Sequence, residues 1–147
     1  MPDIVLAERE MTDAEFARMN AGFDENSSEH GVVIQASDRF GYVATDGETF
    51  VGCASGLAYR NGPHYNGWFY LTDLFVEKPY RRNGLGALLL RRLEERVRIL
   101  GVRHMQTDTA EYEGLAFYRK QGYRVLYEQE SWFSSGQSRF GLRKDLL

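Results

Sequence analysis

Cysteine is nearly absent from this sequence, and the single thiol, Cys53, excludes any disulfide bond within the chain. Small secreted domains that depend on disulfides are therefore excluded, and the composition fits a reducing compartment. Cys53 lies in an apolar run with alternating small residues, which favours an inert thiol in the core over a reactive one.

Long hydrophobic runs are also missing. No segment approaches the roughly 18 consecutive apolar residues that a membrane-spanning helix needs. The first residues, MPDIVLAERE, are too acidic for a secretory signal, and their apolar run is too short. The sequence has no repeats, low-complexity tracts or linkers, so we expect one cytoplasmic domain over residues 1–147 without membrane contact.

Positive charge is not in excess either. The net charge is −3 and the isoelectric point is about 5.6, so there is no electrostatic basis for binding nucleic acid. We also expect no metal ion. What is present is typical of a globular domain: 43% of the residues are hydrophobic and 27% are charged, which is enough for a packed core.

Hydrophobic periodicity and turn residues predict an α/β fold, with elements in the order β-α-β-β-β-α-β-α-β-β. The expected strands span residues 4–7, 40–44, 49–59, 68–76, 102–109, 123–130 and 139–144, and the later helices span 85–100 and 113–120. The first helix starts at Thr12, with Glu15 at capping-box spacing, and should end before the polar segment 24–31. Residues 68–76 are almost continuously apolar, as expected of a central strand covered on both faces. These elements predict a mixed sheet with helices against its faces.

The segment VEKPYRRNGLG, residues 76–86, joins a strand to a helix. Gly84 and Gly86 permit backbone angles and close approaches that a side chain would block. The first amides of a helix have no internal partner and attract phosphate groups, and Arg81 and Arg82 add positive charge beside them. The segment does not match the dinucleotide-binding fingerprint, which would need a third glycine where Leu89 stands. The alternative to a phosphate site is a glycine turn with solvated arginines.

This segment resembles the acetyl-CoA-binding motif of the GNAT superfamily of N-acetyltransferases, R/Q-x-x-G-x-G/A at the start of a long helix after an apolar strand. Arg81, Gly84 and Gly86 occupy the matching positions. The segment AFYRKQGY, residues 116–123, is similar to a second family pattern, A-x-x-F-Y-x-x-x-G-F/Y. The spacing between the two segments also fits, so the resemblance covers essentially the whole chain, and the tail is similar to a bacterial subgroup.

The resemblance implies a mixed, mostly antiparallel sheet of about seven strands with helices on both faces. Its two central strands splay apart, and the pantetheine arm of acetyl-CoA enters the gap like an added strand. The residues implied in binding the coenzyme are Leu74, Phe75, Val76, Arg81, Arg82, Asn83, Gly84, Leu85, Gly86, Ala87, Phe117 and Tyr118. Glu111 departs from the family pattern, in which many members have an asparagine that contacts the pantetheine arm.

The implied reaction is direct attack of an amine on acetyl-CoA in a ternary complex. The amine must lose a proton to a base or a water chain, and an acid near the sulfur would help the thiolate to leave. Tyr118 is the candidate acid by position, and the alternative is that it only packs among aromatic neighbours. The candidate bases are Asp73 and Glu111, with Glu113 and His64 as further alternatives. A water chain served by several groups is favoured over any single base.

Carboxylates and aromatic residues gather where the resemblance places the acceptor. The candidate substrate-binding residues are Asn26, Asp73, Asp108, Glu111, Glu113 and Trp132. An acidic, aromatic-lined cleft would attract a cationic amine, which predicts a polyamine, an amino antibiotic or a basic metabolite. The alternatives are a protein lysine or N-terminus as acceptor, and a coenzyme-A-binding regulatory module without turnover. Exposed aromatics near Trp132 would serve either the cleft or a homodimer contact.

Overall fold

The computed structural model describes residues 2–146, and the contacts within the chain divide it into two units, residues 1–34 and 35–147. Each unit is described by itself. Among the helices of residues 2–146, none combines the length and the apolar character that crossing a membrane requires.

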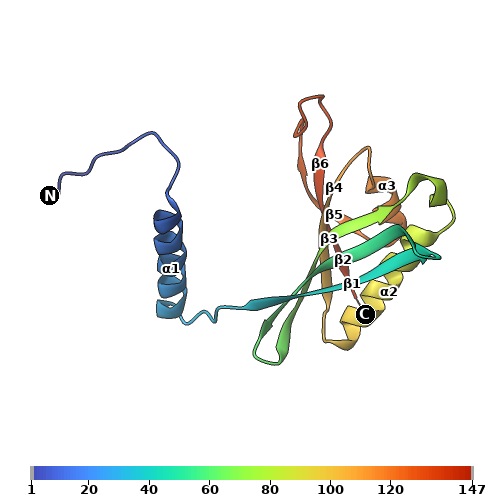
Figure 1. The fold of residues 1–147 in the computed structure, drawn as a ribbon, viewed down its shortest axis with the longest axis horizontal. Coiled ribbons are helices and arrows are strands. Elements are labelled where there is room, and N and C mark those ends of the chain that lie inside the picture. Colours follow the sequence, from blue (N-terminus) through green and yellow to red (C-terminus); the bar gives the residue numbers. More distant parts are fainter. Residues whose placement is uncertain (1, 147) are drawn as a thin grey trace. The chain divides into compact units, whose positions relative to one another are not determined.

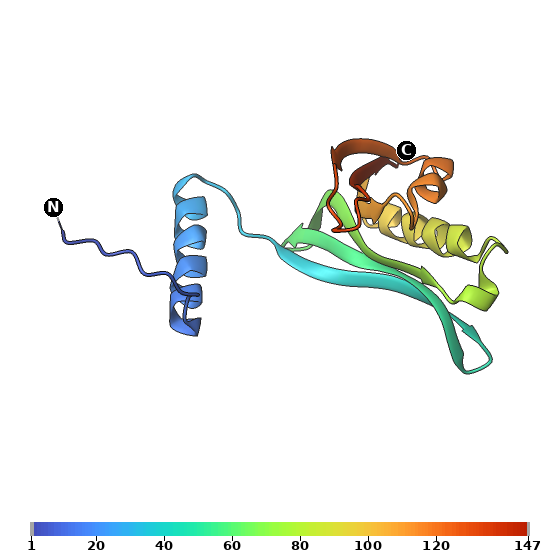
Figure 2. The same cartoon turned by 90° about the horizontal axis from the view of Figure 1, so that it is seen from above.

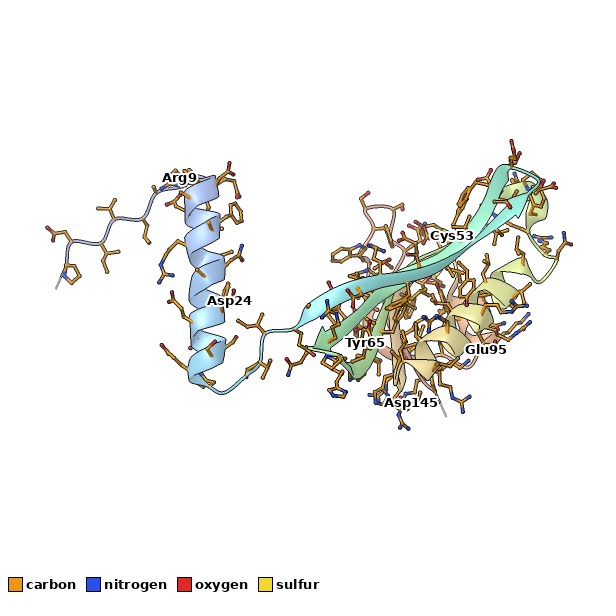
Figure 3. The ribbon with its side chains drawn as sticks, turned by 60° about the horizontal axis from the view of Figure 1, so that its bottom comes forward. Arg9, Asp24, Cys53, Tyr65, Glu95 and Asp145 are labelled. Atoms are coloured by element: carbon orange, nitrogen blue, oxygen red, sulfur yellow. The ribbon has the colours of Figure 1, made fainter. Side chains whose placement is uncertain are left out.

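The first unit contains one helix, α1 (Asp13–Glu29) (Figure 1). The predicted capping box is confirmed: the Thr12 side chain accepts a hydrogen bond from the Glu15 amide at 3.2 Å, and the Glu15 carboxylate accepts one from the Thr12 amide at 2.8 Å. Arg9 binds the same carboxylate at 2.7 Å (Figure 3). The predicted end of the helix before residue 24 is wrong, because the polar segment continues the helix to Glu29.

The predicted strand at residues 4–7 is also wrong, since these residues have no regular secondary structure. A strand needs a hydrogen-bonded partner, and the first unit contains no second strand among residues 2–34. The apolar residues 4–7 therefore have no strand within the first unit with which they could form a sheet.

The second unit is built on a six-stranded sheet with the strand order β1-β2-β3-β4-β6-β5 (Figure 1). The strands are β1 (Ala36–Asp46), β2 (Thr49–Asn61), β3 (His64–Val76), β4 (His104–Ala110), β5 (Arg124–Gln129) and β6 (Arg139–Asp145). Neighbouring strands are antiparallel except β3 and β4, which are parallel. The predicted α/β class and the mixed, mostly antiparallel sheet are confirmed, with six strands rather than about seven.

Helix α2 (Leu85–Ile99) contacts β1, β2 and β3 and runs along one face of the sheet (Figure 2). The apolar residues that this helix buries are Leu89, Leu90, Leu93 and Val97. The short helix α3 (Leu115–Lys120) adds Tyr118 to the same core. Along β3, Phe69 is buried whereas Trp68, on the opposite face, is half-buried, so the expected burial on both faces is not found within residues 35–146.

The hydrogen-bond ladders on both sides of β3 are interrupted, and a gap opens on the side of β4. Between β2 and β3 the register shifts after Ser55, which pairs with Asp73, while Gly56 pairs with Leu71, so Thr72 is the extra residue of a β-bulge. Between β3 and β4 the pairing covers only residues 68–70 and 104–106. Both strands continue beyond these pairs, to residues 76 and 110. The predicted splaying of the two central strands is therefore confirmed.

Candidate active site

A cleft of about 1200 Å³ lies at the end of the sheet where β3 and β4 separate. It is lined by residues of β3, the loop before α2, the start of α2, the end of β4, and α3 with its preceding loop. The lining residues are Thr72, Asp73, Leu74, Phe75, Val76, Tyr80, Arg81, Arg82, Gly84, Leu85, Gly86, Ala87, Thr107, Asp108, Thr109, Tyr112, Glu113, Gly114, Ala116, Phe117, Tyr118, Lys120 and Gln121. The cleft therefore unites both sequence motifs, which are about 30 residues apart in the chain.

The glycine loop, as we call residues 81–87, has free amides and lines this cleft. Arg82 and Gly84 have positive φ angles of 66° and 79°, and α2 begins at Leu85 without a side-chain cap. The first helical hydrogen bond is donated by the Leu88 amide to the Gly84 carbonyl, at 3.0 Å. Among residues 2–146, no protein acceptor is found for the amides of residues 82–87. These amides, at the positive end of a helix, suit an anion such as a diphosphate.

The two arginines of the loop have different surroundings. The amide of Arg81 donates to the Lys78 carbonyl at 3.3 Å, and its side-chain Nε donates to the Val76 carbonyl at 2.8 Å. Arg81 therefore holds the loop to the end of β3, and its terminal guanidinium nitrogens remain for an anion. Arg82 is exposed and lines the cleft with no ion-pair partner among residues 2–146.

Residues 74–76 of β3 offer a second set of main-chain groups. They pair with residues 52–54 of β2 on one side, whereas on the other side β4 has already separated. The main-chain groups that point into the gap are therefore available to an extended ligand, which would bind there as an added strand. This edge and the glycine loop lie along the same cleft.

Tyr118 is almost fully buried in the cleft wall, with 7% of its surface exposed. Its ring packs edge-on against Phe117 and Tyr123, each with centroids 5.3 Å away. Burial raises the pKa of Tyr118 to about 12, while a hydrogen bond with Thr107 lowers it and the charge of Glu113 raises it. The phenol is therefore protonated at neutral pH and is a potential proton donor.

Asp108 lies at the centre of a network that sequence reasoning did not find. Its carboxylate accepts hydrogen bonds from the Tyr70 hydroxyl at 3.1 Å and the Tyr127 hydroxyl at 2.7 Å, and it pairs with Arg139 at 3.0 Å. Gly141 permits this arrangement, because a Cβ there would lie 2.1 Å from the Tyr127 ring. The four polar residues come from β3, β4, β5 and β6, so no local sequence signal joins them.

The other predicted carboxylates occupy different places. Asp73 lines the cleft with a side chain that is 60% exposed. The bulge at Thr72 brings Asp73 to the surface, where the Thr72 hydroxyl lies 2.8 Å from its carboxylate. Glu113 also lines the cleft, whereas Glu111 lies in a separate shallow depression with Tyr112, Ser135, Gly136 and Gln137.

Trp132 does not line the cleft. Trp132 is exposed, and the Arg139 guanidinium stacks over its ring at 5.0 Å. Asn26 belongs to α1 in the first unit, where its carbonyl accepts a hydrogen bond from the His30 amide at 3.2 Å. The roles predicted for both residues in binding the substrate stay predictions.

Cys53 is half-buried on β2 (Figure 3). Burial raises the pKa of its thiol, and the nearby charge of Asp73 raises it further. A thiol that resists ionisation is a poor nucleophile, which supports the inert role predicted for Cys53. Among residues 2–146, no cluster of three or more His, Cys, Asp or Glu side chains could hold a metal ion.

Comparison with known families agrees with this geometry. The model of the acetyltransferase (GNAT) family matches residues 6–123, which is most of the chain. The chain belongs to the GNAT family. As a GNAT acetyltransferase it is an acetyl-CoA-dependent N-acetyltransferase, which confirms the predicted family, enzyme class and cosubstrate.

Individual relatives are distant from this GNAT acetyltransferase. An acetyltransferase from Bacillus cereus has the same fold, with a TM-score of 0.79 at 20% identity over 96% of this chain and 98% of that one. An aminoglycoside 6'-N-acetyltransferase complexed with coenzyme A gives a TM-score of 0.60 at 20% identity, over 74% of this chain and 73% of that one. The L-ornithine N5-acetyltransferase NATA1 of Arabidopsis thaliana is 34% identical over 62 residues, 41% of this chain and 27% of the plant enzyme. The matched segment thus spans about a quarter of that relative.

Proposed function

We propose that this GNAT acetyltransferase acetylates a primary amine of a small cationic molecule by direct attack in a ternary complex. One observation carries the proposal: the free amides of residues 82–87 and the side chain of Tyr118 belong to the walls of one cleft. A ligand whose diphosphate binds at the first therefore has its other end within reach of the second.

The residues of the coenzyme side fit acetyl-CoA. The amides of residues 82–87 and the Arg82 guanidinium would hold the diphosphate, and the open edge of residues 74–76 would bind the pantetheine amides. When bound, acetyl-CoA supplies the acetyl group and a thiolate leaving group. Phe117 lines the same cleft and adds apolar surface beside Tyr118.

Tyr118 is the proposed acid, because its phenol is protonated at neutral pH and lies in the cleft wall. For removal of the proton from the amine, we propose water molecules served by Asp73 and Glu113, which both line the cleft. Glu111 is disfavoured as the base, because its side chain belongs to a separate depression.

The proposed acceptor is cationic because three carboxylates, Asp73, Asp108 and Glu113, line the cleft. Two relatives are named for acetylating amines of this kind, ornithine and an aminoglycoside. We further propose that both units act as one cytoplasmic acetyltransferase domain, because the family match spans residues of each. The exposed Trp132 is a candidate contact in a homodimer, which light scattering after gel filtration would test.

The test is a panel of amines with acetyl-CoA, followed by release of the coenzyme thiol. L-ornithine, spermidine and kanamycin represent the three cationic classes, and a neutral peptide with a free N-terminus is the matched control. We expect turnover with at least one cationic amine and little with the peptide. Acetylation of the peptide alone would reject the cationic class while preserving the transferase.

A further inference from the structure

A buried carboxylate, that of Glu94 on α2, lies in the core of the second unit, where the residue is 7% exposed. One of its oxygens accepts a hydrogen bond from the Tyr123 hydroxyl at 2.8 Å, and the other accepts one from the Lys144 amino group at 3.0 Å. These three residues, which we call the anchor, come from α2, the segment between α3 and β5, and β6. The anchor therefore joins three separate parts of the chain at one buried charge.

The anchor holds the hydroxyl end of the Tyr123 ring. A carboxylate removed from water is costly unless hydrogen bonds and an opposite charge satisfy it, and the anchor supplies both. Burial and the charge of Glu94 raise the pKa of Tyr123, so its hydroxyl stays protonated and donates to the carboxylate. Hydrogen bonds to a charged group are stronger than neutral ones. Because Tyr123 is only 3% exposed, its ring has one strongly preferred position.

The Tyr123 ring in turn contacts Tyr118. The two ring centroids are 5.3 Å apart with the planes at 66°, which is an edge-on contact, and the Tyr123 amide donates a hydrogen bond to the Tyr118 carbonyl at 3.0 Å. Phe117 also packs edge-on against Tyr118, and a Cβ on Gly114 would lie 3.2 Å from the Tyr118 ring. Of these neighbours, Tyr123 is the one with a hydroxyl, so it can carry the position of Glu94 to the Tyr118 ring.

We propose that Tyr123 is a positioning residue for Tyr118, and that Glu94 fixes Tyr123 for this purpose. The hydrogen bond to Glu94 holds the Tyr123 ring, and the edge-on contact with this ring keeps the Tyr118 phenol in place. Among the described residues, those that line the cleft include Tyr118 but neither Tyr123 nor Glu94, so these two act through Tyr118. The inference rests on the proposed role of Tyr118 as the acid. A purely structural anchor would stabilise the protein without affecting the step that Tyr118 serves.

Two variants separate the hydrogen bond from the buried charge. Tyr123→Phe keeps the ring and removes the hydroxyl, whereas Glu94→Gln keeps an acceptor oxygen for the hydroxyl and removes the charge. With whichever of L-ornithine, spermidine or kanamycin is acetylated, we expect Tyr123→Phe to lower kcat about fivefold, with the KM for acetyl-CoA within about twofold. Glu94→Gln should retain kcat within about twofold of the parent. Both variants should unfold at a lower temperature than the parent, because each weakens the anchor.

Val102→Ala controls for lost stability, because Val102 is fully buried just before β4, at the end of that strand away from the cleft. It should lower the unfolding temperature without lowering kcat. In a Tyr118→Phe background, Tyr123→Phe should cause no further loss of kcat, because its effect acts through the phenol. An unchanged kcat in Tyr123→Phe, or an equal loss in both backgrounds, would overturn the proposal. If Tyr123→Phe does not fold, Glu94→Leu removes the same hydrogen bond from the other side and replaces it.

A second measurement does not depend on acetyl transfer. In protein carrying carbon-13 at the tyrosine Cζ atoms, the Tyr118 signal is identified by its loss in Tyr118→Phe. We expect this signal to shift in Tyr123→Phe and to stay in place in Glu94→Gln and Val102→Ala. A Tyr118 signal unmoved by Tyr123→Phe would overturn the positioning role, even if kcat falls.

The same spectrum separates this inference from the proposed function. If Tyr118→Phe leaves kcat unchanged, the acid role fails, and if none of the three amines is acetylated, the cationic acceptor fails. In either case, the response of the Tyr118 signal to Tyr123→Phe still decides whether Tyr123 holds Tyr118.

Discussion

The two halves of the cleft are formed by different chemical groups, main-chain groups in one and side chains in the other. The half that we propose for the coenzyme, called the coenzyme half, consists of main-chain groups, the free amides of residues 82–87 and the open strand edge of residues 74–76. The half that we propose for the acceptor amine, called the acceptor half, consists of side chains that are largely bonded to one another. Asp108 already has three partners, and Asp73 has Thr72 at 2.8 Å and Arg39 at 4.0 Å.

This difference has a consequence for recognition. The free main-chain amides make no hydrogen bond to another protein group. A ligand that binds them therefore replaces only water. A carboxylate held by two tyrosines and an arginine keeps its position, but its charge is partly balanced before any substrate arrives. The coenzyme half is therefore a binding surface in itself, whereas the acceptor half also stabilises the sheet.

Tyr118, the proposed acid, lies in the wall of the same cleft, and its substitution should have the largest effect. We expect Tyr118→Phe to lower kcat roughly 100-fold, because a positioned acid commonly contributes about that factor or more. The affinity for coenzyme A, measured by calorimetry, should change by less than about twofold. Tyr112→Phe, an exposed tyrosine of the same cleft, is the control and should remain near the parent kcat. An unchanged kcat in Tyr118→Phe would remove the proposed acid.

Asp108 tests whether the acceptor half contributes to stability. Asp108→Asn should lower the free energy of unfolding by about 2 kcal/mol, because it weakens hydrogen bonds and an ion pair at a side chain that is only 14% exposed. Asp73→Asn is the matched control, since that carboxylate is mostly exposed, and should cost less than about 0.5 kcal/mol. Urea denaturation measures both. Equal losses would mean that the network around Asp108 contributes no special stability.

Gly84 and Gly86 test two different roles of glycine in the coenzyme half. Gly84 adopts an unusual backbone angle, whereas Gly86 leaves space for a ligand. Gly84 has a φ of 79°, so Gly84→Ala should destabilise the protein by about 1–2 kcal/mol. A Cβ on Gly86 would meet Phe117 at 3.6 Å, an ordinary contact, so Gly86→Ala should keep or slightly raise the stability of the helix.

Calorimetry with coenzyme A measures whether Gly86 leaves space for the ligand. We expect Gly86→Ala to weaken binding by a few fold, because its methyl group would lie where the coenzyme approaches the amides. If Gly86→Ala binds coenzyme A as tightly as the parent protein, then close approach at that residue is not needed.

The smallest expected effect is a pH dependence in the acceptor half. The hydrogen bond to Asp108 raises the pKa of Tyr127 above its usual value near 10, and partial burial raises it further. A raised folded-state pKa gives stability that is complete below pH 10 and is lost as the pH rises through the folded value. Urea unfolding between pH 8 and 11 should show this decline, and Asp108→Asn should reduce its slope. A decline of the same slope in Asp108→Asn would assign it to other tyrosines.

Much of the coenzyme half could be predicted from the sequence because its cause is local. Gly84, Gly86 and the start of α2 lie within a few residues, and helix geometry alone leaves the first amides free. Tyr118 was found through its motif, together with the neighbouring Phe117. The splayed strands were implied by the resemblance. In contrast, the hydrogen bond from the Thr107 hydroxyl to the Leu71 carbonyl, just beyond the last paired residues of β3 and β4, left no signal in the sequence.

The acceptor half could not be predicted to the same degree. In a regular strand the side chains alternate between the two faces, so the face on which Asp73 lies depends on one extra residue, Thr72, which the sequence does not reveal. Glu111 and Glu113 are two residues apart, yet only Glu113 lines the cleft. The partners of Asp108 were missed because pairing across a sheet depends on strand order and register.

By itself, the sequence determined the α/β class, the family and the glycine turn that opens α2, and it named a candidate acid, since these depend on backbone angles, helix ends and short-range spacing. Only the tertiary structure decided which carboxylates share the cleft and which of them are already paired. It also decided that the Thr107 hydroxyl binds the Leu71 carbonyl where the pairing of β3 and β4 ends. The physical reason is that contacts between β3, β4, β5 and β6 join residues tens of positions apart, and no local pattern specifies such contacts.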